Sequence, residues 1–271
     1  MNLKKIKRGG LRDKKIFKQN NVLEPLITII TVVLNNDKYL QECLDSLHIQ
    51  KYKNYEHIII DGGSTDNTLK ILENNNDKID LWLSEKDRGI YDAFNKGMHL
   101  ARGQYLGFLN SDDIYYSDKT LNYVIEAFDQ NQQADFIFGP VKKHWAVLYG
   151  YKPWKIYFTW GFYSSHSTGF FIKTNAAKNV GEYNLKYKYS SDYDYFFRMI
   201  VKKKLIGIGV KKDKIFGIFR RGGFSSRVKF LDHFKEEIAI RNDNGQNKII
   251  ILLIIVYKSI RHINKIIKSL K

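Results

Sequence analysis

Short apolar runs and amphipathic segments alternate along the first half of the chain. Residues 26–35, LITIITVVLN, are rich in β-branched apolar residues and end at the turn-prone NND. Such a run is typical of a strand that is buried on both faces of a parallel sheet. The next segment carries apolar side chains at helical spacing, namely Leu40, Cys43, Leu44 and Leu47. The pattern therefore predicts a strand followed by an amphipathic helix.

The same alternation continues to about residue 141. Further strands are predicted at YEHIIID (55–61), DLWLSE (80–85), GQYLGFLN (103–110) and DFIFGPV (135–141). Helices are predicted between them at TLKILENN (68–75), GIYDAFNKGMHLA (89–101) and KTLNYVIEAFDQ (119–130). Strands that alternate with helices of this length predict an α/β fold, with a Rossmann-like, mostly parallel central sheet and flanking helices.

The second half of the chain has a different character. Aromatic residues crowd 144–170 without a clean period, which fits either a wall that faces substrate or an irregular part of the core. A helix is predicted at SSDYDYFFRMIVKK (190–203), followed by the loop RRGGFSS (220–226). We find no internal repeat and no low-complexity linker. Residues 25–247 are therefore interpreted as one domain, between an N-terminal tail (1–24) and a C-terminal segment (248–271).

The net charge of +17 changes the picture at the two ends of the chain. Residues 1–24 hold eight basic and two acidic residues, and residues 248–271 hold six basic residues and no acid. The body between them is close to balanced. Basic ends of this kind suit an anionic surface, and the alternative is that they are simply solvated tails.

The C-terminal segment combines charge with an apolar stripe. IIILLIIVY (249–257) is a run of nine apolar residues, too short to span a bilayer, which takes about 20. Beyond it, Ile260, Ile263, Ile266, Ile267 and Leu270 share one helical face, and Lys258, Arg261, Lys265, Lys268 and Lys271 share the other. This pattern predicts a basic amphipathic helix in a membrane interface. The alternative is a helix packed on the body or on a partner chain, for example in a homodimer.

Polar residues follow three of the predicted strands, at 35–37, 61–66 and 110–113. Ligands in open α/β sheets bind beyond the carboxyl ends of the strands, where these clusters would meet. The adjacent carboxylates Asp112 and Asp113, in FLNSDD, suit Mg²⁺ or Mn²⁺. No Cys/His cluster, P-loop or G-x-G-x-x-G motif is present, and the single Cys43 allows no intrachain disulfide. The pattern therefore favours a metal–diphosphate site in which the diphosphate is a leaving group.

Several stretches together resemble the family 2 glycosyltransferases, inverting enzymes of the GT-A fold that use nucleotide-sugar donors. The matching stretches, in order, are PLITIITVVLNN, SLHIQKYKNYEHIIIDGGSTDNT, SEKDRGIYDAFNKG, ARGQYLGFLNSDD and SSDYDYFFRM. They cover about residues 25–200, and their combination resembles the branch found in bacterial exopolysaccharide and O-antigen assembly. The resemblance implies a nucleotide-sugar half at about 25–140 and an acceptor half at about 141–247.

The resemblance assigns roles to the strand-end residues. NSDD falls where the family has its D-x-D motif, so Asp112 and Asp113 would hold the divalent metal, and Asn110 and Ser111 would bind the donor. Asp61 would contact the nucleobase or ribose, and Gly62 stands where many relatives have a second Asp. The nucleotide pocket would also be lined by Thr31, Val32 and Asn35, although plain strand packing is the alternative for Thr31 and Val32.

Two residues of SEKDRGIYDAFNKG are also implied in donor binding. Arg88 could offer forked donors to an anionic ligand, and Asp92 follows it by four positions. The alternative for Asp92 is an ordinary helix ion pair with Lys96, which also lies four residues away.

The resemblance places the catalytic base in YSSDYDYFF. Asp192 aligns with the family's catalytic acid-base position, which is usually written E-D, and Ser191 replaces the Glu. Asp194 is the second candidate. The alternative for both carboxylates is a favourable interaction with the dipole at the start of a helix.

Three further residues are expected near the acceptor or in a lid. His166, in SSHSTGFF, would line the acceptor pocket, or be a hydrogen-bonded structural histidine. Arg220 and Arg221, followed by two glycines, form a cationic loop that could close over the diphosphate or simply be solvated.

These features predict an enzyme that moves a hexosyl or N-acetylhexosaminyl group from a nucleotide-sugar donor, expected to be a UDP-sugar, to a glycan or lipid-linked acceptor. We expect it in the synthesis of a bacterial surface polysaccharide such as capsule or lipopolysaccharide, at the cytoplasmic face of the membrane. One rival is an inactive relative acting as a scaffold, since Asn110 and Ser191 replace acidic residues. The other is a nucleic-acid-binding protein, which the separation of the aromatic residues from the basic ends disfavours.

Overall fold

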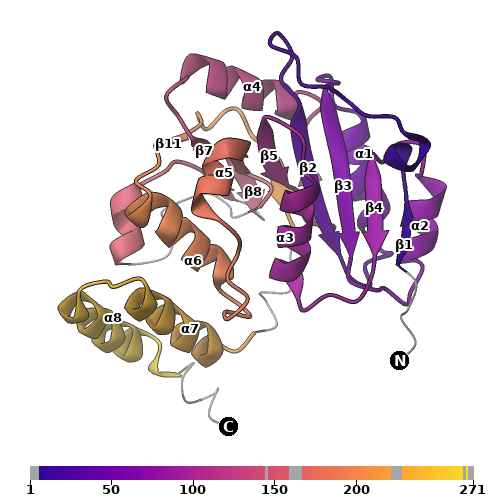
Figure 1. Ribbon diagram of the computed structural model, residues 1–271. Helices are drawn as coiled ribbons and strands as arrows, with labels where there is room; N and C mark the ends of the chain where they lie inside the picture. The colour runs from indigo at the N-terminus through magenta and orange to yellow at the C-terminus, as the bar shows by residue number, and fades with distance from the viewer. Residues whose placement is uncertain (1–5, 144–145, 159–166, 221–227, 265–266, 268–271) are drawn as a thin grey trace.

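A central mixed sheet organises the computed structural model, which describes residues 6–143, 146–158, 167–220, 228–264 and 267 (Figure 1). Its strand order is β1-β4-β3-β2-β5-β10-β7-β11. The strands are β1 (Lys7–Gly9), β2 (Ile27–Val33), β3 (Tyr55–Asp61), β4 (Leu81–Ser84), β5 (Tyr105–Phe108), β7 (Phe136–Phe138), β10 (Phe170–Lys173) and β11 (Gly207–Gly209).

The parallel part of the sheet confirms the predicted alternation of strands and helices. β4, β3, β2 and β5 are mutually parallel neighbours. The helices that connect the elements of this half are α1 (Leu40–His48), α2 (Thr68–Asn74), α3 (Ile90–Leu100) and α4 (Thr120–Gln130). β10 is antiparallel to both β5 and β7, so the sheet is mixed where the second half of the chain enters it.

Both faces of β2 are buried, as its continuous apolar run predicts. Ile30 and Val32 belong to a core shared with α3 and with aromatic residues of the second half. Ile27 and Ile29 point to the opposite face, into a core shared with α1 and α4. Because successive side chains of a strand alternate between faces, one run of seven residues serves two cores.

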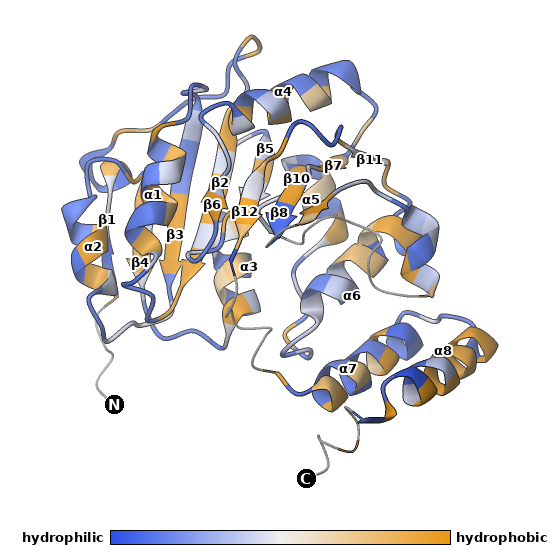
Figure 2. Cartoon of the chain, turned by 180° about the vertical axis from the view of Figure 1, so that it is seen from behind, coloured by the Kyte–Doolittle hydropathy of each residue, from blue (hydrophilic) through white to orange (hydrophobic). Residues whose placement is uncertain are grey.

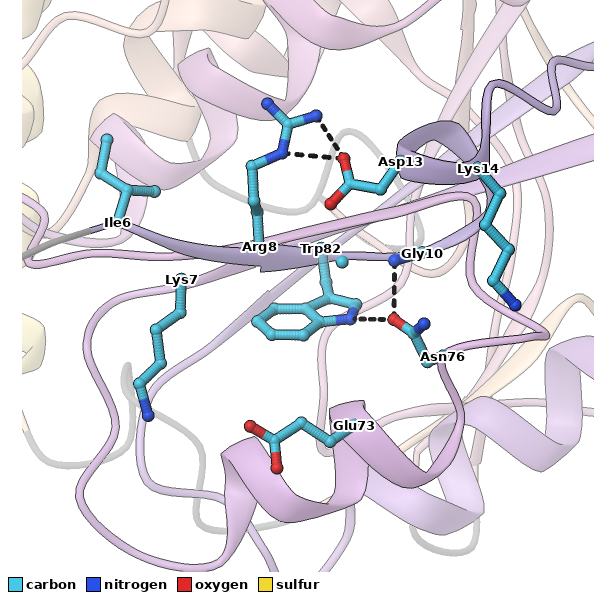
Figure 3. Close-up of a pocket in the computed structure, with 10 residues that line it drawn as sticks. Ile6, Lys7, Arg8, Gly10, Asp13, Lys14, Glu73, Asn76 and Trp82 are labelled. Atoms are coloured by element: carbon cyan, nitrogen blue, oxygen red, sulfur yellow. Dashed lines mark hydrogen bonds and ion pairs between the residues drawn. The ribbon is translucent and has the colours of Figure 1, made fainter.

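The N-terminal residues differ from the expected tail. β1 pairs antiparallel with β4 and becomes the edge of the sheet. Figure 3 shows why the chain is held there: the Asn76 side-chain oxygen accepts hydrogen bonds from the Gly10 amide (2.7 Å) and the Trp82 indole (2.9 Å) beneath the strand. The pocket drawn in that view is lined by these residues of β1 and β4 and by Asn76, with Lys7 and Lys14 at its sides.

Much of the N-terminal positive charge is paired with acids of the body. The half-buried Arg12 binds Glu56, Lys14 lies 2.6 Å from Asp77, and Lys18 lies 3.2 Å from Asp80. A count of charges along the sequence could not show these partners, since they lie more than 40 residues away.

A small second sheet follows the NSDD turn. Its order is β6-β12-β8-β9, with β6 (Ile114–Tyr115), β12 (Gly217–Phe219), β8 (Val141–Lys143) and β9 (Ala146–Leu148). β12 pairs antiparallel with β6. This pairing brings the chain at Arg220 back beside the turn that precedes β6.

The second half ends in a group of helices on one side of the sheet (Figure 1). They are the short 3₁₀ helix η2 (Pro153–Tyr157), α5 (Thr174–Val180), α6 (Ser191–Phe197), α7 (Phe230–Asp243) and α8 (Lys248–Arg261). α6 continues into a π-helical turn at Arg198–Lys202. α7 lies between α6 and α8 and contacts both. No helix in the described part of the chain is long and apolar enough to cross a membrane.

α8 forms as predicted, and one of its faces packs on the body. Ile251 and Ile254 are buried, and Lys258 binds Glu237 of α7. Figure 2 shows that apolar residues also cover the outer side of α8. The packing on α7 confirms the alternative of a helix packed on the body for the inner face, and the membrane interface stays a prediction for the outer face. Ile266 and Leu270 of the predicted stripe lie outside the described residues.

Candidate active site

The polar clusters after β2, β3 and β5 meet at one edge of the sheet, as their parallel order requires. Asn35 donates its backbone N–H to the Ser64 hydroxyl at 2.7 Å, which joins the first cluster to the second. The Asn36 side chain donates to the Ser111 hydroxyl at 2.9 Å, which joins the first to the third. The predicted convergence of the three strand ends is thus present in the structure.

Asp61 is less exposed than a residue that contacts a nucleobase is expected to be. It is fully buried, and its carboxylate accepts hydrogen bonds from the backbone amides of Gly63 (3.2 Å) and Ser64 (3.0 Å) and from the hydroxyls of Ser64 and Ser84. Four donors fill the acceptor sites of a carboxylate. Through these bonds Asp61 holds the loop after β3 and the end of β4 in place, and they argue against its expected contact with a nucleobase or ribose.

Thr31 and Val32 are also part of the packed sheet. The Thr31 hydroxyl lies 2.9 Å from the ring nitrogen Nε2 of buried His57, and Val32 belongs to the core on the α3 face. The packing alternative describes them better than pocket lining. Asn35 is different, because it is exposed at the strand end with a left-handed backbone (φ 49°) and accepts the Thr65 amide at 2.8 Å.

The two carboxylates of the NSDD turn have different environments. Asp113 is buried, and it accepts hydrogen bonds from the Thr168 hydroxyl (2.8 Å) and the Arg220 backbone N–H (3.1 Å). Burial and then the negative charge of Asp112 raise the pKa of Asp113 to about 7. Asp112 is half-buried at the same turn. The turn thus presents one carboxylate at the edge and keeps the other behind it.

Arg88 and Asp92 form a pair at the start of α3. The Arg88 guanidinium donates to Asp92 at 2.8 Å and its backbone N–H donates at 3.1 Å, while Lys96 lies 3.5 Å from the same carboxylate. Burial acts to raise the pKa of Asp92, but the hydrogen bonds from Arg88 outweigh it and lower that pKa. The carboxylate is therefore occupied by the protein, whereas most of the Arg88 side chain is exposed.

Asp87 is a carboxylate to which the sequence gave no role. Its Oδ1 accepts the Gly89 amide at 2.9 Å, and its Oδ2 accepts no hydrogen bond from the residues that the structure describes. A Cβ built on Gly62 would lie 2.6 Å from this Oδ2. Asp87 thus occupies the space beside Gly62, where a larger side chain would collide with it.

Asp192 lies at the same edge of the sheet as the strand-end clusters. Tyr91, in the first turn of α3, has its hydroxyl 3.1 Å from Asp192 Oδ1 and 3.1 Å from the Tyr189 carbonyl oxygen. Because α3 begins just after β4 ends, this contact places Asp192 at the carboxyl edge. Burial and the charge of Asp192 raise the pKa of Tyr91, so the phenol keeps its proton and can donate it in a hydrogen bond.

The loop that carries Asp192 is held by α7. Glu236 accepts the backbone amides of Lys188 (2.8 Å) and Tyr189 (2.9 Å), and His233 Nδ1 lies 3.1 Å from the Ser190 hydroxyl. These contacts fix the three residues just before the start of α6. The half-buried Asp192 is therefore positioned from two sides, by α3 and by α7.

Asp194 has a different environment from Asp192. It is buried, lies 2.8 Å from Arg198 Nε, and accepts a hydrogen bond from the Asn244 side chain at 2.8 Å. Both carboxylate oxygens are thus engaged, one within its own helix by Arg198 and the other by Asn244 at the end of α7. These contacts favour Asp192 over Asp194 as the candidate base.

Arg220 is tethered close to the NSDD turn. Its guanidinium binds Glu42 of α1 and lies 4.8 Å from the centre of the Tyr39 ring, and its backbone holds Asp113. Arg220 therefore contacts other residues of the protein in this structure, and its closure over a diphosphate stays a prediction. His166 and Arg221 lie outside the described residues.

Comparison with known proteins decides the family. The sequence pattern of the family described as Glycosyl transferase family 2 matches residues 28–205, about two thirds of the chain. The chain belongs to glycosyl transferase family 2. It is 29% identical over 196 residues to a PGL/p-HBAD biosynthesis glycosyltransferase of Mycobacterium bovis, covering 67% of this chain and 72% of that protein. An uncharacterized glycosyltransferase of Rickettsia typhi is 29% identical over 195 residues, covering 67% and 61%.

Solved structures share the GT-A fold of this glycosyltransferase. Residues 1–349 of S. aureus TarS in complex with UDP-GlcNAc align with a TM-score of 0.66 at 19% identity, covering 86% of this chain and 72% of that chain. A mannosyltransferase from Pyrobaculum calidifontis, in complex with GDP-Man and Mn²⁺, aligns with a TM-score of 0.61 at 16% identity, covering 94% and 76%. The predicted fold is confirmed.

The NSDD turn of this glycosyltransferase fits the divalent metal that such a fold commonly uses. The Asn110 side-chain oxygen is buried and has no hydrogen-bond partner among the described residues, and the Asp112 carboxylate lies two residues away. Oxygen donors of this kind suit Mg²⁺ or Mn²⁺. In the described ranges no three His, Cys, Asp or Glu side chains gather that could hold a metal.

Several residues of this family 2 enzyme were not among the site residues predicted from the sequence. Tyr91 and Asp87 sit inside the recognised stretch SEKDRGIYDAFNKG, so that stretch could have drawn attention to them. Thr168, Glu236 and His233 come from other parts of the chain, and only the folded structure brings them to the two carboxylate turns.

Proposed function

We propose that the chain is a metal-dependent, inverting glycosyltransferase that uses a nucleoside-diphosphate sugar, and that Asp192 is its catalytic base. The observation that carries this proposal is the contact between Tyr91 and Asp192 at the sheet edge that also bears the NSDD turn. The contact sets a half-buried carboxylate near the strand ends where ligands of open α/β sheets bind. The donor is proposed to be a UDP-sugar, which is supported by the UDP-GlcNAc complex of TarS.

The proposed reaction is one displacement at the anomeric carbon. The acceptor hydroxyl oxygen forms the new bond to that carbon while the bond to the diphosphate oxygen breaks on the opposite face, so the configuration inverts. Asp192 accepts the hydroxyl proton during the attack. Its hydrogen bond from Tyr91 orients the carboxylate and leaves its second oxygen for the acceptor. No covalent enzyme intermediate is needed.

The residues of the strand ends would bind the leaving group. Asp112 and the Asn110 side-chain oxygen would hold a divalent cation, which when bound offsets the charge that develops on the departing diphosphate. Asp113 supports the turn from behind through Thr168 and the Arg220 backbone. The exposed guanidinium of Arg88 is proposed to contact a donor phosphate.

The nucleoside would lie beside the loops after β2 and β4. Asn35 and Ser111 are kept as donor contacts, and Asp87 is added to them. The Oδ2 atom of Asp87 faces Gly62 and accepts no hydrogen bond from the described residues. A carboxylate there could accept the N3–H of uracil, a role that the saturated Asp61 cannot take.

The acceptor is proposed to be a glycan or a lipid-linked glycan of a bacterial surface polysaccharide. The mycobacterial relative is named as a glycosyltransferase of PGL/p-HBAD biosynthesis, which supports a role in a biosynthetic glycosyl transfer. We further propose that the enzyme works at the inner face of the cell membrane, reached through residues 248–271.

A screen of nucleotide sugars tests this function directly. Thermal unfolding is measured with UDP-, GDP- and dTDP-sugars, each with Mn²⁺ and with a chelator. The proposal expects one UDP-sugar to raise the melting temperature only when Mn²⁺ is present, and NMR of the transfer product to show an inverted anomeric configuration. Equal protection in chelator, or a retained configuration, would contradict the metal or the mechanism respectively. Binding without any turnover would favour the inactive scaffold.

A further inference from the structure

The outer side of α8 carries an apolar stripe that the fold of the chain leaves uncovered. Ile249, Leu252, Leu253, Val256 and Ile260 recur at intervals of three and four residues, and all are exposed, from 49% at Val256 to 73% at Ile260. Ile263 and Ile267 continue the spacing and are exposed as well. Contiguous exposed apolar surface of this kind marks an interaction site.

The inner face of the same helix already satisfies its packing against α7. Ile251 and Ile254 are buried there, and Lys258 binds Glu237. A helix that needed apolar residues only to join the fold would be polar on its outer face. The stripe therefore points to a partner outside this part of the chain.

A second group of exposed apolar side chains adjoins the start of α8. Trp154 and Phe158 of the η2 region are 59% and 48% exposed, with ring centroids 6.5 Å apart. η2 is held against the α7–α8 turn because the Tyr157 carbonyl oxygen accepts hydrogen bonds from Gln246 (2.6 Å) and Arg241 (2.9 Å). Figure 1 shows this short helix beside the end of the α7–α8 pair where α8 begins.

The charges around these side chains identify the partner. Lys152 and Lys155 flank Trp154, Lys248 opens α8 and exposed Arg261 ends it. The whole segment 248–271 contains six basic residues and no acid. Apolar stripes bordered by cations, with a tryptophan at the margin, match the anionic headgroup region of a bilayer.

We propose that η2 and α8 form one surface that binds an anionic lipid bilayer. This adds a second, aromatic contact to the C-terminal helix and so fixes the rotation of the enzyme on the membrane. A symmetric dimer through this stripe would bring the cations of the two copies together with no acid from 248–271 to pair them, which disfavours such a dimer.

The surface is coupled to the catalytic loop through a single helix. α7 contacts α8 on one side, and on the other its Glu236 and His233 hold residues 188–190, directly before Asp192. A helix is about 10–12 Å across, so the proposed base would lie close to the headgroups. This part rests on the proposed function, and it implies that the acceptor is presented by the bilayer.

Vesicle flotation of the full-length chain tests the surface. The variants are Leu252→Glu/Leu253→Glu on the stripe, Trp154→Glu on η2, and Leu23→Glu as a matched control, since Leu23 is 88% exposed and remote in the sequence from both elements. Thermal unfolding shows that each variant is folded. Hydrolysis of a UDP-sugar, measured without vesicles, tests the proposed function separately.

We expect the wild type to bind vesicles that contain phosphatidylglycerol, more weakly but still measurably at high salt. The stripe variant should bind at least about tenfold more weakly, because two leucines lose their burial and anionic lipids repel the new charges. Trp154→Glu should weaken binding about threefold or more, and Leu23→Glu by less than about twofold.

Three results would overturn the proposal. Wild-type protein that never binds the vesicles would remove the surface altogether. Equal binding by Trp154→Glu and Leu23→Glu would remove η2 from it. A wild-type dimer that the stripe variant dissociates, with vesicle binding unchanged, would assign the stripe to a subunit interface. Wild-type protein that binds vesicles but does not hydrolyse any UDP-sugar would instead contradict the proposed enzymatic function and leave the surface in place.

Discussion

The turn after β5 and the start of α6 each carry two carboxylates, and in both places the structure separates the pair. In NSDD, Asp113 is buried against Thr168 and the Arg220 backbone, while Asp112 is half-buried at the edge. In SSDYD, Asp194 is buried against Arg198 and Asn244, while Asp192 is half-buried and meets Tyr91. One carboxylate of each pair is buried among donors that support the structure, and we propose the half-buried one as the member that meets a ligand.

The difference follows from the cost of burying charge. A buried carboxylate needs hydrogen-bond donors from the protein. Those donors occupy the oxygen lone pairs that would otherwise bind a metal ion or accept a proton from the acceptor hydroxyl. A half-buried carboxylate keeps part of its acceptor capacity. Burial and partners therefore divide the roles within each pair, although the sequence presents the members as near equals.

The largest effect should come from the ligand-facing carboxylate at α6. Asp192→Asn keeps the shape of the site but cannot accept a proton, so kcat for transfer should fall by about 10²–10⁴-fold. Donor affinity, measured by calorimetry, should stay within about twofold of the wild type. A variant that turns over normally would show that Asp192 is not the base.

The next effect sharpens the comparison within NSDD. Asp112→Asn should weaken Mn²⁺-dependent UDP binding by roughly 10- to 100-fold, a scale that is reached even by residues behind the metal ligands. Asp113→Asn should lower the melting temperature, because it disturbs the Thr168 and Arg220 contacts. It should weaken UDP binding less than Asp112→Asn does. If the two variants bind UDP equally, the turn does not divide its carboxylates as we describe.

A smaller effect concerns stability at α6. Asp194→Asn removes the charge that faces Arg198, and we expect a loss of about 1–3 kcal/mol in the free energy of unfolding. Urea denaturation measures this loss. Asp192→Asn is the paired control and should change stability by less than about 0.5 kcal/mol. Equal losses in the two variants would place both residues in the supporting structure.

The smallest effect tests the contact that positions the proposed base. Tyr91→Phe removes one hydroxyl, and kcat should fall about three- to tenfold while the donor KM stays unchanged, since the carboxylate loses only its orienting hydrogen bond. A rise in KM with an unchanged kcat would indicate that Tyr91 contacts substrate instead.

Much of the donor side of the molecule could be predicted from the sequence. The apolar runs of β2, β3 and β5 fix three strands, and their parallel order brings the polar ends at Asn35, Asp61 and Asn110 together without any knowledge of side-chain contacts. The family resemblance rests on those same stretches. These features are local in the sequence, which is why periodicity and motif spacing identify them.

The roles of individual residues depended on partners that lie far away in the sequence. Asp61 is saturated partly by Ser84, 23 residues later, and Asp194 by Asn244, 50 residues later. The expected N-terminal tail forms an edge strand because β4 and Trp82 receive it. No pattern within either segment could show these contacts, so pairs such as Asp192 and Asp194 could be found from the sequence but not fully separated.

Anomalous diffraction from a crystal grown with Mn²⁺ and UDP would test the central claim most directly. The account predicts a manganese peak about 2.0–2.3 Å from an Asp112 carboxylate oxygen, close to the Asn110 side-chain oxygen, with Asp113 still bound to Thr168 and with Asp192 facing the space beyond the diphosphate. A peak on Asp113 with Asp112 turned away, or a diphosphate bound remote from NSDD, would contradict it.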